Sequence, residues 1–467
     1  MARLDFQPGQ QIDGFTLQEK LADGGMATIW AVSHAHFRGE MVMKLPRLRG
    51  EDDPTAIVGF ETEQMILPRL HGPHVPAFVA SGDFTAQPYL VMERVGGASL
   101  RARLDDLPLS IEEVASIGAR VAEALHDLHR QQVIHLDIKP SNILFRPDGT
   151  AVLVDFGLAR HDRLPDLLAE EFRLPLGTAP YMSPEQVLHD RNEPRSDLFA
   201  LGVMLYYLLT GVRPFGFPTS QTGLRKRLWR DPTPPRALRA DCPPWLQQII
   251  LRCLAVDPAQ RFATAAELAL VLRHPDQLPL TALADKREAD ARWPVFKRWL
   301  RALGREPVAQ HSAAERLDRA PIVMVAVDVS PGQEALNESL LRSVRLLMSV
   351  AGEARLACVS VLKTQRIGID FNEDEAGRNL RVKRMVSVRH WAKPLALPEA
   401  RITFHVLAAP DPASALVEFA RQNQVDHLIM GARESSALRR HLGSVSAQVV
   451  AESPCSVTVV RRREQAH

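Results

Sequence analysis

The stretch from Val133 to Gly157 constrains the fold of this chain more than any other part of the sequence. It contains two short apolar runs, at 143–145 and 151–154, separated by the turn sequence Pro-Asp-Gly at 147–149. An Asp-Gly pair between two such runs predicts a two-stranded hairpin, because a tight turn of this kind needs a residue with positive φ. The two ends of this stretch would therefore lie side by side.

Polar side chains stand at that open end. Asn142 comes just before the first run and Asp155 just after the second, and Asp137 lies one short loop earlier. Two carboxylates and an amide that converge need partners, because an apolar core cannot accept them unpaired. Such oxygen ligands suit Mg²⁺, which takes few protein ligands and completes its octahedron with phosphate oxygens and water.

The order of these residues resembles that of eukaryotic-like protein kinases. The sequences HLDIKPSN at 135–142 and DFG at 155–157 are similar to the catalytic loop and the metal-binding motif of that family. Every polar catalytic group of the pattern is kept, whereas Leu136 replaces its arginine. The resemblance implies a bilobal α+β kinase fold over residues 12–274. Lys139, two residues after the catalytic aspartate, is typical of the Ser/Thr-directed branch, here of the bacterial type.

The resemblance also implies the roles of these residues. Asp137 would accept the proton of the substrate hydroxyl, and Lys139 would neutralise the γ-phosphate. Asn142 and Asp155 would hold Mg²⁺ between the phosphates of ATP. The implied cofactors are therefore ATP and Mg²⁺, and the implied substrate is a protein with Ser or Thr.

The N-terminal residues 12–45 alternate like strands and contain the sequence LADGGMATI at 21–29. This sequence is similar to the glycine-rich loop of the family, whose backbone N–H groups cover the ATP phosphates. Because Ala22 and Ala27 replace the first and third glycines, an ordinary Gly-Gly hairpin is the alternative for this motif taken alone.

The sequence YLVMERVGG at 89–97 is similar to the last strand of the first lobe and the hinge that follows it. Met92 would line the back of the adenine pocket, and the backbone of residues 93–95 would hydrogen-bond the adenine. The nucleotide site implied by the resemblance is lined by Leu21, Ala22, Gly24, Gly25, Ile29, Val42, Lys44, Met92, Glu93, Val95, Leu144 and Asp155.

Lys44 ends a predicted strand and matches the family lysine that reaches the α- and β-phosphates. The next helix is expected to begin at Pro54, and Glu63 lies on or beside its inward apolar stripe. A carboxylate in that place needs a cation, so we expect an ion pair between Lys44 and Glu63 that belongs to the catalytic machinery. Glu61, on a different face, is expected to be an ordinary surface acid.

The segment 158–176 contains no Ser, Thr or Tyr. In the kinase family the arginine before the catalytic aspartate helps to bind a phosphorylated activation segment, and here that position is Leu136. Both features predict a kinase that is not switched on by phosphorylation of this segment. We expect Asp166, Glu170 or Glu171, or a contact from another domain, to order it instead.

The sequence Ser183-Pro184-Glu185 is similar to the end of the family's activation segment, and Arg261 matches the ion-pair partner of that glutamate. Asp197 opens an apolar helix and would brace the backbone of the catalytic loop. These features favour a protein substrate, because a small-molecule phosphotransferase is expected to lack the Ser-Pro-Glu sequence and its partner Arg261.

Residues 275–320 are punctuated by proline and rich in charge and alanine, as expected of a linker. Within it, apolar residues recur at helical spacing among basic ones, at Trp293, Phe296, Leu300 and Leu303. A helix docked on one domain is favoured over a membrane-surface or partner helix.

Residues 321–462 alternate between apolar strands and helices, which predicts an α/β fold with a doubly wound parallel sheet. This part resembles the universal stress protein family over nearly all of its length. In its nucleotide-binding pattern the second glycine is missing here, Glu434 stands near the phosphate position, and Gly443-Ser444 comes one residue early. Asp328, Gly431, Gly443 and Ser444 are candidates for nucleotide binding, and a structural or dimerising role, giving a homodimer, is the alternative.

Composition argues against several classes of protein. The net charge of the 467 residues is +2, which argues against a nucleic-acid binder. Four cysteines without a CxxC pair are typical of a reduced cytosolic protein. The N-terminus has no apolar signal segment, and the apolar stretch 198–209 is shorter than the roughly 20 residues of a membrane span. We therefore expect a cytoplasmic protein without a transmembrane segment.

The leading hypothesis is an active Ser/Thr protein kinase that is regulated or targeted by its universal stress domain. The alternative is an ATP-binding pseudokinase that serves as a scaffold in stress signalling. Ala22, Ala27 and Leu136 support the alternative, although none of them removes a group that does chemistry.

Overall fold

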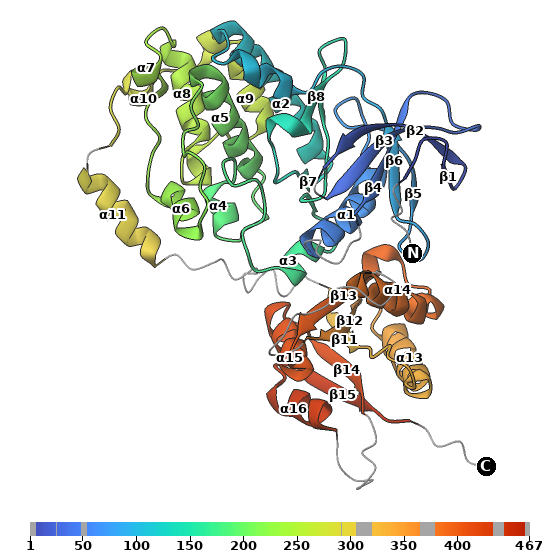
Figure 1. The fold of residues 1–467 in the computed structure, drawn as a ribbon. Coiled ribbons are helices and arrows are strands. Elements are labelled where there is room, and N and C mark those ends of the chain that lie inside the picture. Colours follow the sequence, from blue (N-terminus) through green and yellow to red (C-terminus); the bar gives the residue numbers. More distant parts are fainter. Residues whose placement is uncertain are drawn as a thin grey trace, which may run out of the picture.

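The computed structural model describes residues 6–24, 26–47, 54–290, 292–304, 320–364, 379–432 and 443–462. A lobe rich in strands, a helical lobe and an α/β domain follow one another along the chain (Figure 1). The first two lobes agree with the predicted bilobal α+β fold.

The first lobe is an antiparallel sheet in the order β1-β2-β3-β4-β6-β5, beside the helix α1 (Pro54–Ile66). Side chains alternate in β4 (Met41–Pro46): Met43 is buried in the core of the sheet, and Lys44 faces the other way. This alternation turns Lys44 towards α1. The other strands are β1 (Gln11–Ile12), β2 (Phe15–Asp23), β3 (Ala27–Ser33), β5 (Phe78–Gly82) and β6 (Tyr89–Glu93).

The second lobe is helical, with its core between α2 (Ile111–Arg130), α5 (Arg195–Thr210), α8 (Pro244–Cys253) and α9 (Ala265–Arg273). The side chain of Ser110 caps α2 by accepting a hydrogen bond from the N–H of Glu113. Gly211 ends α5 with a φ of 72°, a left-handed conformation that glycine adopts at least cost. The shorter elements are β7 (Val133–Ile134), β8 (Ile143–Phe145), β9 (Ala151–Leu153), β10 (Arg160–His161), α3 (Leu167–Glu171), α4 (Pro184–Val187), α6 (Gln221–Arg225), α7 (Pro235–Leu238) and α10 (Ala282–Asp285).

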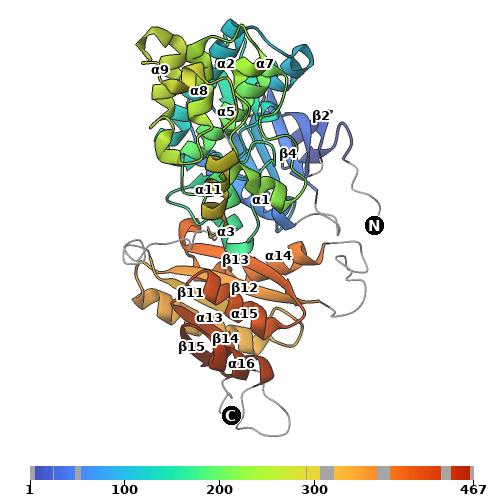
Figure 2. The same cartoon turned by 90° about the vertical axis from the view of Figure 1, so that its left-hand side faces the viewer.

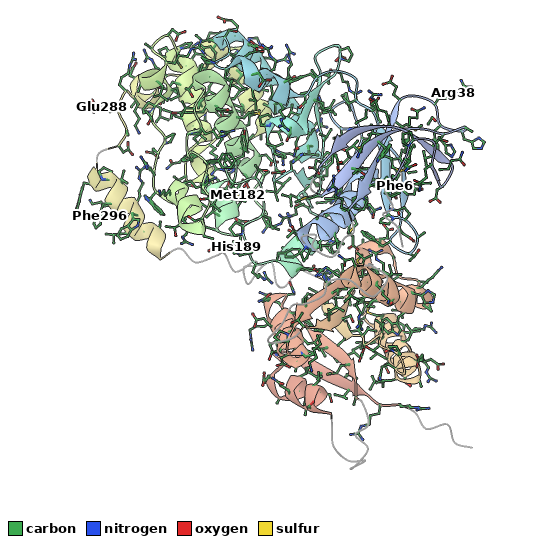
Figure 3. The ribbon with its side chains drawn as sticks, in the orientation of Figure 1. Phe6, Arg38, Met182, His189, Glu288 and Phe296 are labelled. Carbon is green, nitrogen blue, oxygen red and sulfur yellow. The ribbon has the colours of Figure 1, made fainter. Side chains whose placement is uncertain are left out.

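The helix α11 (Arg292–Leu303) follows the helical lobe and lies against it (Figure 1). Ala302 packs with Met182 and Leu228, and the guanidinium of Arg298 lies 2.9 Å from Asp231. Its opposite side carries exposed apolar residues, among them Phe296, which is labelled in Figure 3. Among the described residues, no helix combines the length and the apolar character needed to cross a membrane.

The C-terminal domain is a parallel sheet in the order β13-β12-β11-β14-β15, which confirms the predicted doubly wound fold. One face packs against α13 and α14, and the other against α15 and α16. Residues 433–442, before α16, lie outside the described residues. The bounds are β11 (Ile322–Ala326), α13 (Glu334–Val350), β12 (Arg355–Lys363), α14 (Leu380–Ala392), β13 (Ile402–Ala409), α15 (Pro412–Gln422), β14 (His427–Gly431), α16 (Ser444–Glu452) and β15 (Ser456–Val460).

The C-terminal domain touches the kinase-like lobes at α1 and α3, as both views show (Figures 1 and 2). Met385 of α14 and Val406 of β13 join the apolar cluster that contains Phe60 of α1. The prediction that Glu61 is a surface acid is wrong, because its side chain is 8% exposed and forms an ion pair with Arg389 of α14. The face of α1 that carries Glu61 points away from the first lobe, and the C-terminal domain covers it.

Candidate active site

The predicted hairpin forms from β8 and β9, which pair antiparallel, and Gly149 in its turn has a φ of 87°. At its open end the N–H of Val154 donates to the carbonyl of Asn142 at 3.0 Å. The ladder thus brings Asn142 beside the residue that precedes Asp155, as the sequence predicts.

Asp137 is held on both of its carboxylate oxygens. Oδ1 accepts from the hydroxyl of Thr178 at 2.7 Å and from its N–H at 3.1 Å. Oδ2 accepts from the ammonium of Lys139 at 2.6 Å and from the amide of Asn142 at 3.2 Å. Lys139 also reaches the hydroxyl of Thr178 at 3.1 Å. The end of the activation segment and the catalytic loop therefore orient one carboxylate together.

Lys44 joins the two lobes. Its ammonium lies 2.5 Å from Oε2 of Glu63 on α1 and 2.8 Å from Oδ1 of Asp155. The other oxygen of Glu63 accepts from the N–H of Phe156 at 3.2 Å, so α1 also contacts the DFG sequence directly. The structure therefore brings together Lys44, its predicted partner Glu63 and the predicted metal ligand Asp155.

The charges of this cluster depend on one another. Burial lowers the pKa of Lys44, but attraction to Asp155 and Glu63 outweighs burial and raises this pKa above its ordinary value. Lys44 in turn lowers the pKa of Asp155 to about 2. Burial raises the pKa of Glu63, and Lys44 opposes this shift. At neutral pH Asp155 is ionised, which a metal ligand requires.

The donor set fits Mg²⁺ and phosphate. Asp155 uses one oxygen for Lys44, and its side chain is 43% exposed, so the other oxygen is open to a cation. The amide nitrogen of Asn142 donates to the backbone carbonyl of Asp137 at 3.0 Å, which turns its oxygen away from that residue. One carboxylate oxygen and one amide oxygen match a cation that takes its other ligands from phosphate and water.

The residues predicted to line the nucleotide site lie on both sides of the hinge. Val42 of β4 pairs with Met92 of β6 in the first lobe, and Leu144 belongs to β8 in the second lobe. The N–H of Glu93 donates to Ala77 at 2.8 Å. Among the described residues, the N–H of Val95 has no backbone partner.

The loop between β2 and β3 is the part of the predicted nucleotide site that is open to solvent. Ala22 pairs with Ile29, and the N–H of Gly24 donates to the carbonyl of Ala27 at 3.1 Å. Leu21, Ala22 and Gly24 are exposed, whereas Ile29 is half-buried. Gly25 lies outside the described residues.

The catalytic loop is braced from α5, as predicted. Asp197 accepts from the N–H groups of His135 at 2.9 Å and Leu136 at 2.8 Å. Sequence analysis missed a third partner, His129, whose Nε2 lies 2.8 Å from Asp197. The spacing of His129 on the polar side of its helix gave no signal of a partner more than 60 residues away along the chain. Leu136 itself is buried, and its carbonyl accepts from the amide of Gln186 at 2.8 Å.

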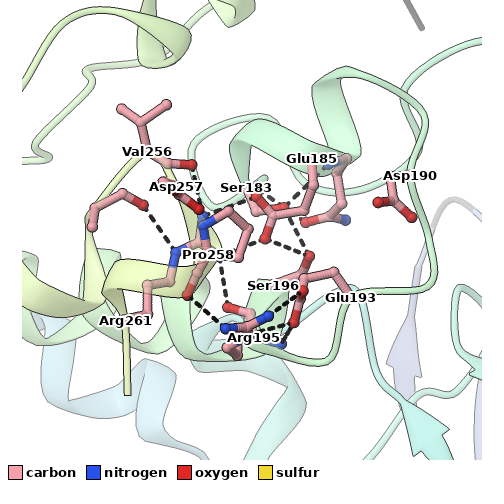
Figure 4. Close-up of polar contacts among 12 residues, drawn as sticks. Ser183, Glu185, Asp190, Glu193, Arg195, Ser196, Val256, Asp257, Pro258 and Arg261 are labelled. Carbon is pink, nitrogen blue, oxygen red and sulfur yellow. Dashed lines mark hydrogen bonds and ion pairs between the residues drawn. The ribbon is translucent and has the colours of Figure 1, made fainter. Parts of the chain in front are cut away.

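The predicted pair of Glu185 and Arg261 is buried in the helical lobe (Figure 4). The guanidinium contacts the two carboxylate oxygens at 2.5 and 2.9 Å. Ser196 of α5 donates to the same carboxylate at 2.8 Å. This network fixes the segment after Thr178 relative to α5.

The activation segment forms the short helix α3, and its acids have separate partners. Asp166 caps α3 by accepting from the N–H of Ala169, and its other oxygen lies 2.7 Å from Arg191. Glu170 and Glu171 contact cations of the C-terminal domain instead. Arg191 and these cations were missed by sequence analysis, although the basic character of the helix at 380–392 was a signal.

The candidate nucleotide site of the C-terminal domain is only partly described. Asp328 follows β11, Gly431 ends β14, and Gly443 precedes Ser444 at the start of α16. A Cβ atom on Gly431 would lie 2.8 Å from Leu336, so helix packing is sufficient to explain this glycine. Glu434 lies outside the described residues.

A strand-rich lobe and a helical lobe, joined by a hinge above a lysine, an aspartate and an asparagine, define the class of bilobal phosphotransferases. The protein kinase domain family matches residues 15–275, and the Universal stress protein family matches residues 321–461. The chain therefore belongs to the protein kinase family and carries a universal stress protein domain after its kinase domain.

Named relatives agree with this assignment. The serine/threonine-protein kinase PknB of Mycolicibacterium smegmatis is 31% identical over 279 residues, which are 58% of this chain and 45% of that protein. The probable serine/threonine-protein kinase PknB of Corynebacterium glutamicum is 33% identical over 266 residues, which are 55% of this chain and 41% of that protein. The chain thus spans less than half the length of these curated relatives.

Among solved structures, the crystal structure of the Mycobacterium tuberculosis PknI kinase domain is similar to this chain. The two are 25% identical with a TM-score of 0.45, and the match covers 57% of this chain and 98% of that one.

Proposed function

We propose that this chain is an ATP- and Mg²⁺-dependent Ser/Thr protein kinase. Its kinase domain spans residues 12–274, a linker with a helix spans 275–320, and the universal stress domain spans 321–462. The observation that carries the proposal is the single site in which Asp137 is oriented by Lys139 and Asn142, while Lys44 bridges Glu63 and Asp155.

In this proposal each residue has one task. Asp137 orients the substrate hydroxyl and accepts its proton, and Lys139 neutralises the γ-phosphate. Lys44, held by Glu63, binds the α- and β-phosphates, and Asn142 and Asp155 hold the metal. ATP with Mg²⁺ supplies the phosphoryl group and neutralises part of its charge. The N–H of Val95 and the carbonyl of Glu93 bind the adenine.

We further propose that the kinase works without a phosphate in residues 158–176, and that the universal stress domain regulates or targets it. The absence of a hydroxyl from this segment and the presence of Leu136 support the first part. The contact of the stress domain with α1 and α3 supports the second.

The partners follow from the same reasoning. The substrate is a protein with Ser or Thr, since the Glu185–Arg261 pair resembles the part of the family that binds peptides. A homodimer through the universal stress domain is supported by β15, which lies at the edge of its sheet. The cytoplasmic location stays a prediction of the sequence.

The alternative, an ATP-binding pseudokinase, rests on Ala22, Ala27 and Leu136. Ala22 and Ala27 lie on the paired strands β2 and β3 that flank the loop. Leu136 is buried beside the catalytic aspartate and has no chemical task. All three substitutions leave the charged site intact.

Transfer of radiolabelled phosphate from ATP to a generic protein substrate tests the proposal. We expect the full-length chain to label the substrate with Mg²⁺, and Asp137→Asn to lower the rate by about 10²–10⁴-fold, because the variant cannot accept the proton. Asp241→Asn, an exposed aspartate in the helical lobe, is the matched control and should keep the rate. Transfer that survives Asp137→Asn points to a contaminating kinase. Nucleotide binding by the wild-type chain without any transfer favours the pseudokinase.

A further inference from the structure

The buried part of the contact between the two domains pairs acids of the kinase side with cations of the stress domain. At its rim Arg69 and Arg173 of the kinase side meet Glu399 and the amide side chains of Gln422 and Asn423. The kinase side presents three carboxylates from α1 and α3, which we call the acidic face: Glu61, Glu170 and Glu171. The stress domain presents four cationic or basic side chains from β12, α14 and β13, which we call the basic face: Arg355, Arg381, Arg389 and His405. The acids are between 5% and 11% exposed and His405 is fully buried, so both faces exclude most solvent.

Each carboxylate has a partner across the contact. Glu170 lies 2.7 Å from Arg355 and 3.0 Å from Nε2 of His405. Glu171 lies 3.1 Å from Nδ1 of the same histidine and forms an ion pair with Arg381.

The pair of Glu61 and Arg389 extends the contact to α1. The guanidinium of Arg389 also lies over the rings of Phe84, from the kinase domain, and Phe404, from the stress domain. The basic face therefore contacts both α1 and α3 of the kinase domain.

Such a contact is specific for one arrangement of α1 and α3. Buried charges lose their hydration, and only well-placed opposite charges offset this cost. Burial and the nearby charge of Glu171 both raise the pKa of Glu61, whereas Arg389 lowers it. Without the basic face the acids on α1 and α3 would repel each other. The buried arrangement of the acidic face is thus stabilised by the cations of the basic face.

The same two elements position the catalytic groups. Glu61 points from α1 to the stress domain, and Glu63, on the same helix, binds Lys44 and the N–H of Phe156. Leu167 and Leu168 of α3 pack on Val58 of α1, so a movement of one helix moves the other. Among the described residues, no polar contact joins the stress domain to Asp137, Lys139 or Asn142. The contact therefore fixes the catalytic elements and leaves the catalytic groups open.

We propose that the basic face is an intramolecular activator that holds α1 and α3 in the catalytic arrangement, in place of a phosphate in the activation segment. A phosphorylated segment brings an added anion to cations of its own kinase domain. Here the anions are the permanent carboxylates of Glu170 and Glu171, and the cations come from a second domain. The proposal rests on the kinase activity proposed above, and it specifies that the stress domain activates the kinase.

Charge reversal in the full-length chain tests the proposal. Arg381→Glu places a third carboxylate beside Glu170 and Glu171, and we expect it to lower the rate of phosphate transfer by about tenfold or more. The double variant Glu171→Arg with Arg381→Glu restores an opposite pair and should recover part of the rate, because the new guanidinium also faces His405. Arg421→Glu is the matched control, because Arg421 lies in the same domain and, among the residues that the structure describes, forms an ion pair with the exposed Glu418 alone; it should leave the rate unchanged.

Hydrogen exchange of residues 165–173 gives a second measurement that does not require activity. We expect the protection of these amides to fall in Arg381→Glu and to return in the double variant, with the same far-UV circular dichroism throughout. A higher rate in Arg381→Glu would make the stress domain an inhibitor and overturn the proposal. An unchanged rate with lost protection overturns it as well, because docking would then be without effect. A wild-type chain that is protected but transfers no phosphate would instead refute the kinase activity itself and leave the docking contact in place.

Discussion

The carboxylate of Asp197 orders the catalytic loop through both of its oxygens. Leu136 has a φ of 61°, which a non-glycine residue adopts only when its surroundings hold it. Both Leu136 and His135 donate their N–H groups to Asp197, and His129 donates from the other side. Burial raises the pKa of Asp197, but the hydrogen bond with His129 helps to bring it below its ordinary value. An ionised acid therefore fixes the loop that carries Asp137.

The variant Asp197→Asn should weaken both the fold and the reaction. An amide has one acceptor oxygen in place of two, so one N–H of the loop loses its partner, which costs about 1–3 kcal/mol of the free energy of unfolding. We also expect kcat to fall by about tenfold or more, because the loop no longer fixes Asp137. Urea unfolding and steady-state kinetics measure the two effects, with Asp241→Asn as control. A normal kcat in Asp197→Asn would show that the loop is held by other groups.

At the scale of elements, the helical lobe depends on the close approach of α5 and α8. A Cβ atom on Gly202 of α5 would lie 2.5 Å from the Cβ of Cys253 and 3.3 Å from Leu254. Both neighbours are buried, so neither can move without disturbing the core. The absence of a side chain at Gly202 lets α5, which carries Asp197, pack this closely.

Gly202→Ala is therefore expected to lower the free energy of unfolding by about 1–3 kcal/mol, through overpacking. Helix propensity acts in the opposite direction, since alanine is favoured over glycine in a helix by roughly 1 kcal/mol. Gly352→Ala is the control, because nothing lies within 4 Å of its added Cβ. Urea unfolding of both variants makes the comparison. A Gly202→Ala variant as stable as the wild type would mean that α8 can move away at no cost.

At the scale of the whole molecule, the contact between the domains depends on His405. This ring faces Glu170 and Glu171 of α3, with Arg355 and Arg381 beyond them, and it contacts Thr403 and the ring of Phe419 in its own domain. Burial lowers the pKa of His405, but its close contacts with the two glutamates raise it from 6.5 to about 9. Burial likewise raises the pKa of Glu170, but Arg355 and His405 lower it to about 2.

These shifts predict how docking depends on pH. A raised pKa means that protonated His405 stabilises the contact fully below pH 6.5, and that this contribution is lost as the pH rises through about 9. The lowered pKa of Glu170 means that its contribution is present above pH 4.5 and lost as the pH falls towards 2. Fluorescence energy transfer between labels on the two domains of the full-length chain should therefore decrease between pH 6.5 and 9. His405→Gln should remove this decrease, and a decrease that persists in the variant would contradict the role of His405.

Much of the kinase site could be predicted because its signals are local in sequence. The Asp-Gly turn at 148–149 fixes which residues meet at the end of the hairpin, and two-residue periodicity sets the direction of Lys44. The alternation of apolar strands and helices likewise predicts the parallel sheet of the stress domain. In each case the local structure depends on a short stretch of chain, and the residue pattern of that stretch predicts it.

The partners of Glu61, Glu170 and Glu171 could not be predicted in this way. Their burial results from a second domain that begins more than 140 residues later in the chain, and helical periodicity reports only the face that an element turns to its own core. Glu61 therefore looks like a solvated acid from its position on α1. His129 is a similar case, since its partner Asp197 is brought near by the packing of α2 on α5.

Residue types and short spacings were enough to predict the two folds, the candidate catalytic groups and an activation segment without a hydroxyl. The cations that meet the acids of α1 and α3 became known from the folded structure alone. Electrostatic pairing across a domain contact depends on distances between residues that the chain itself separates by hundreds of positions, and these distances exist only once both domains have folded and docked.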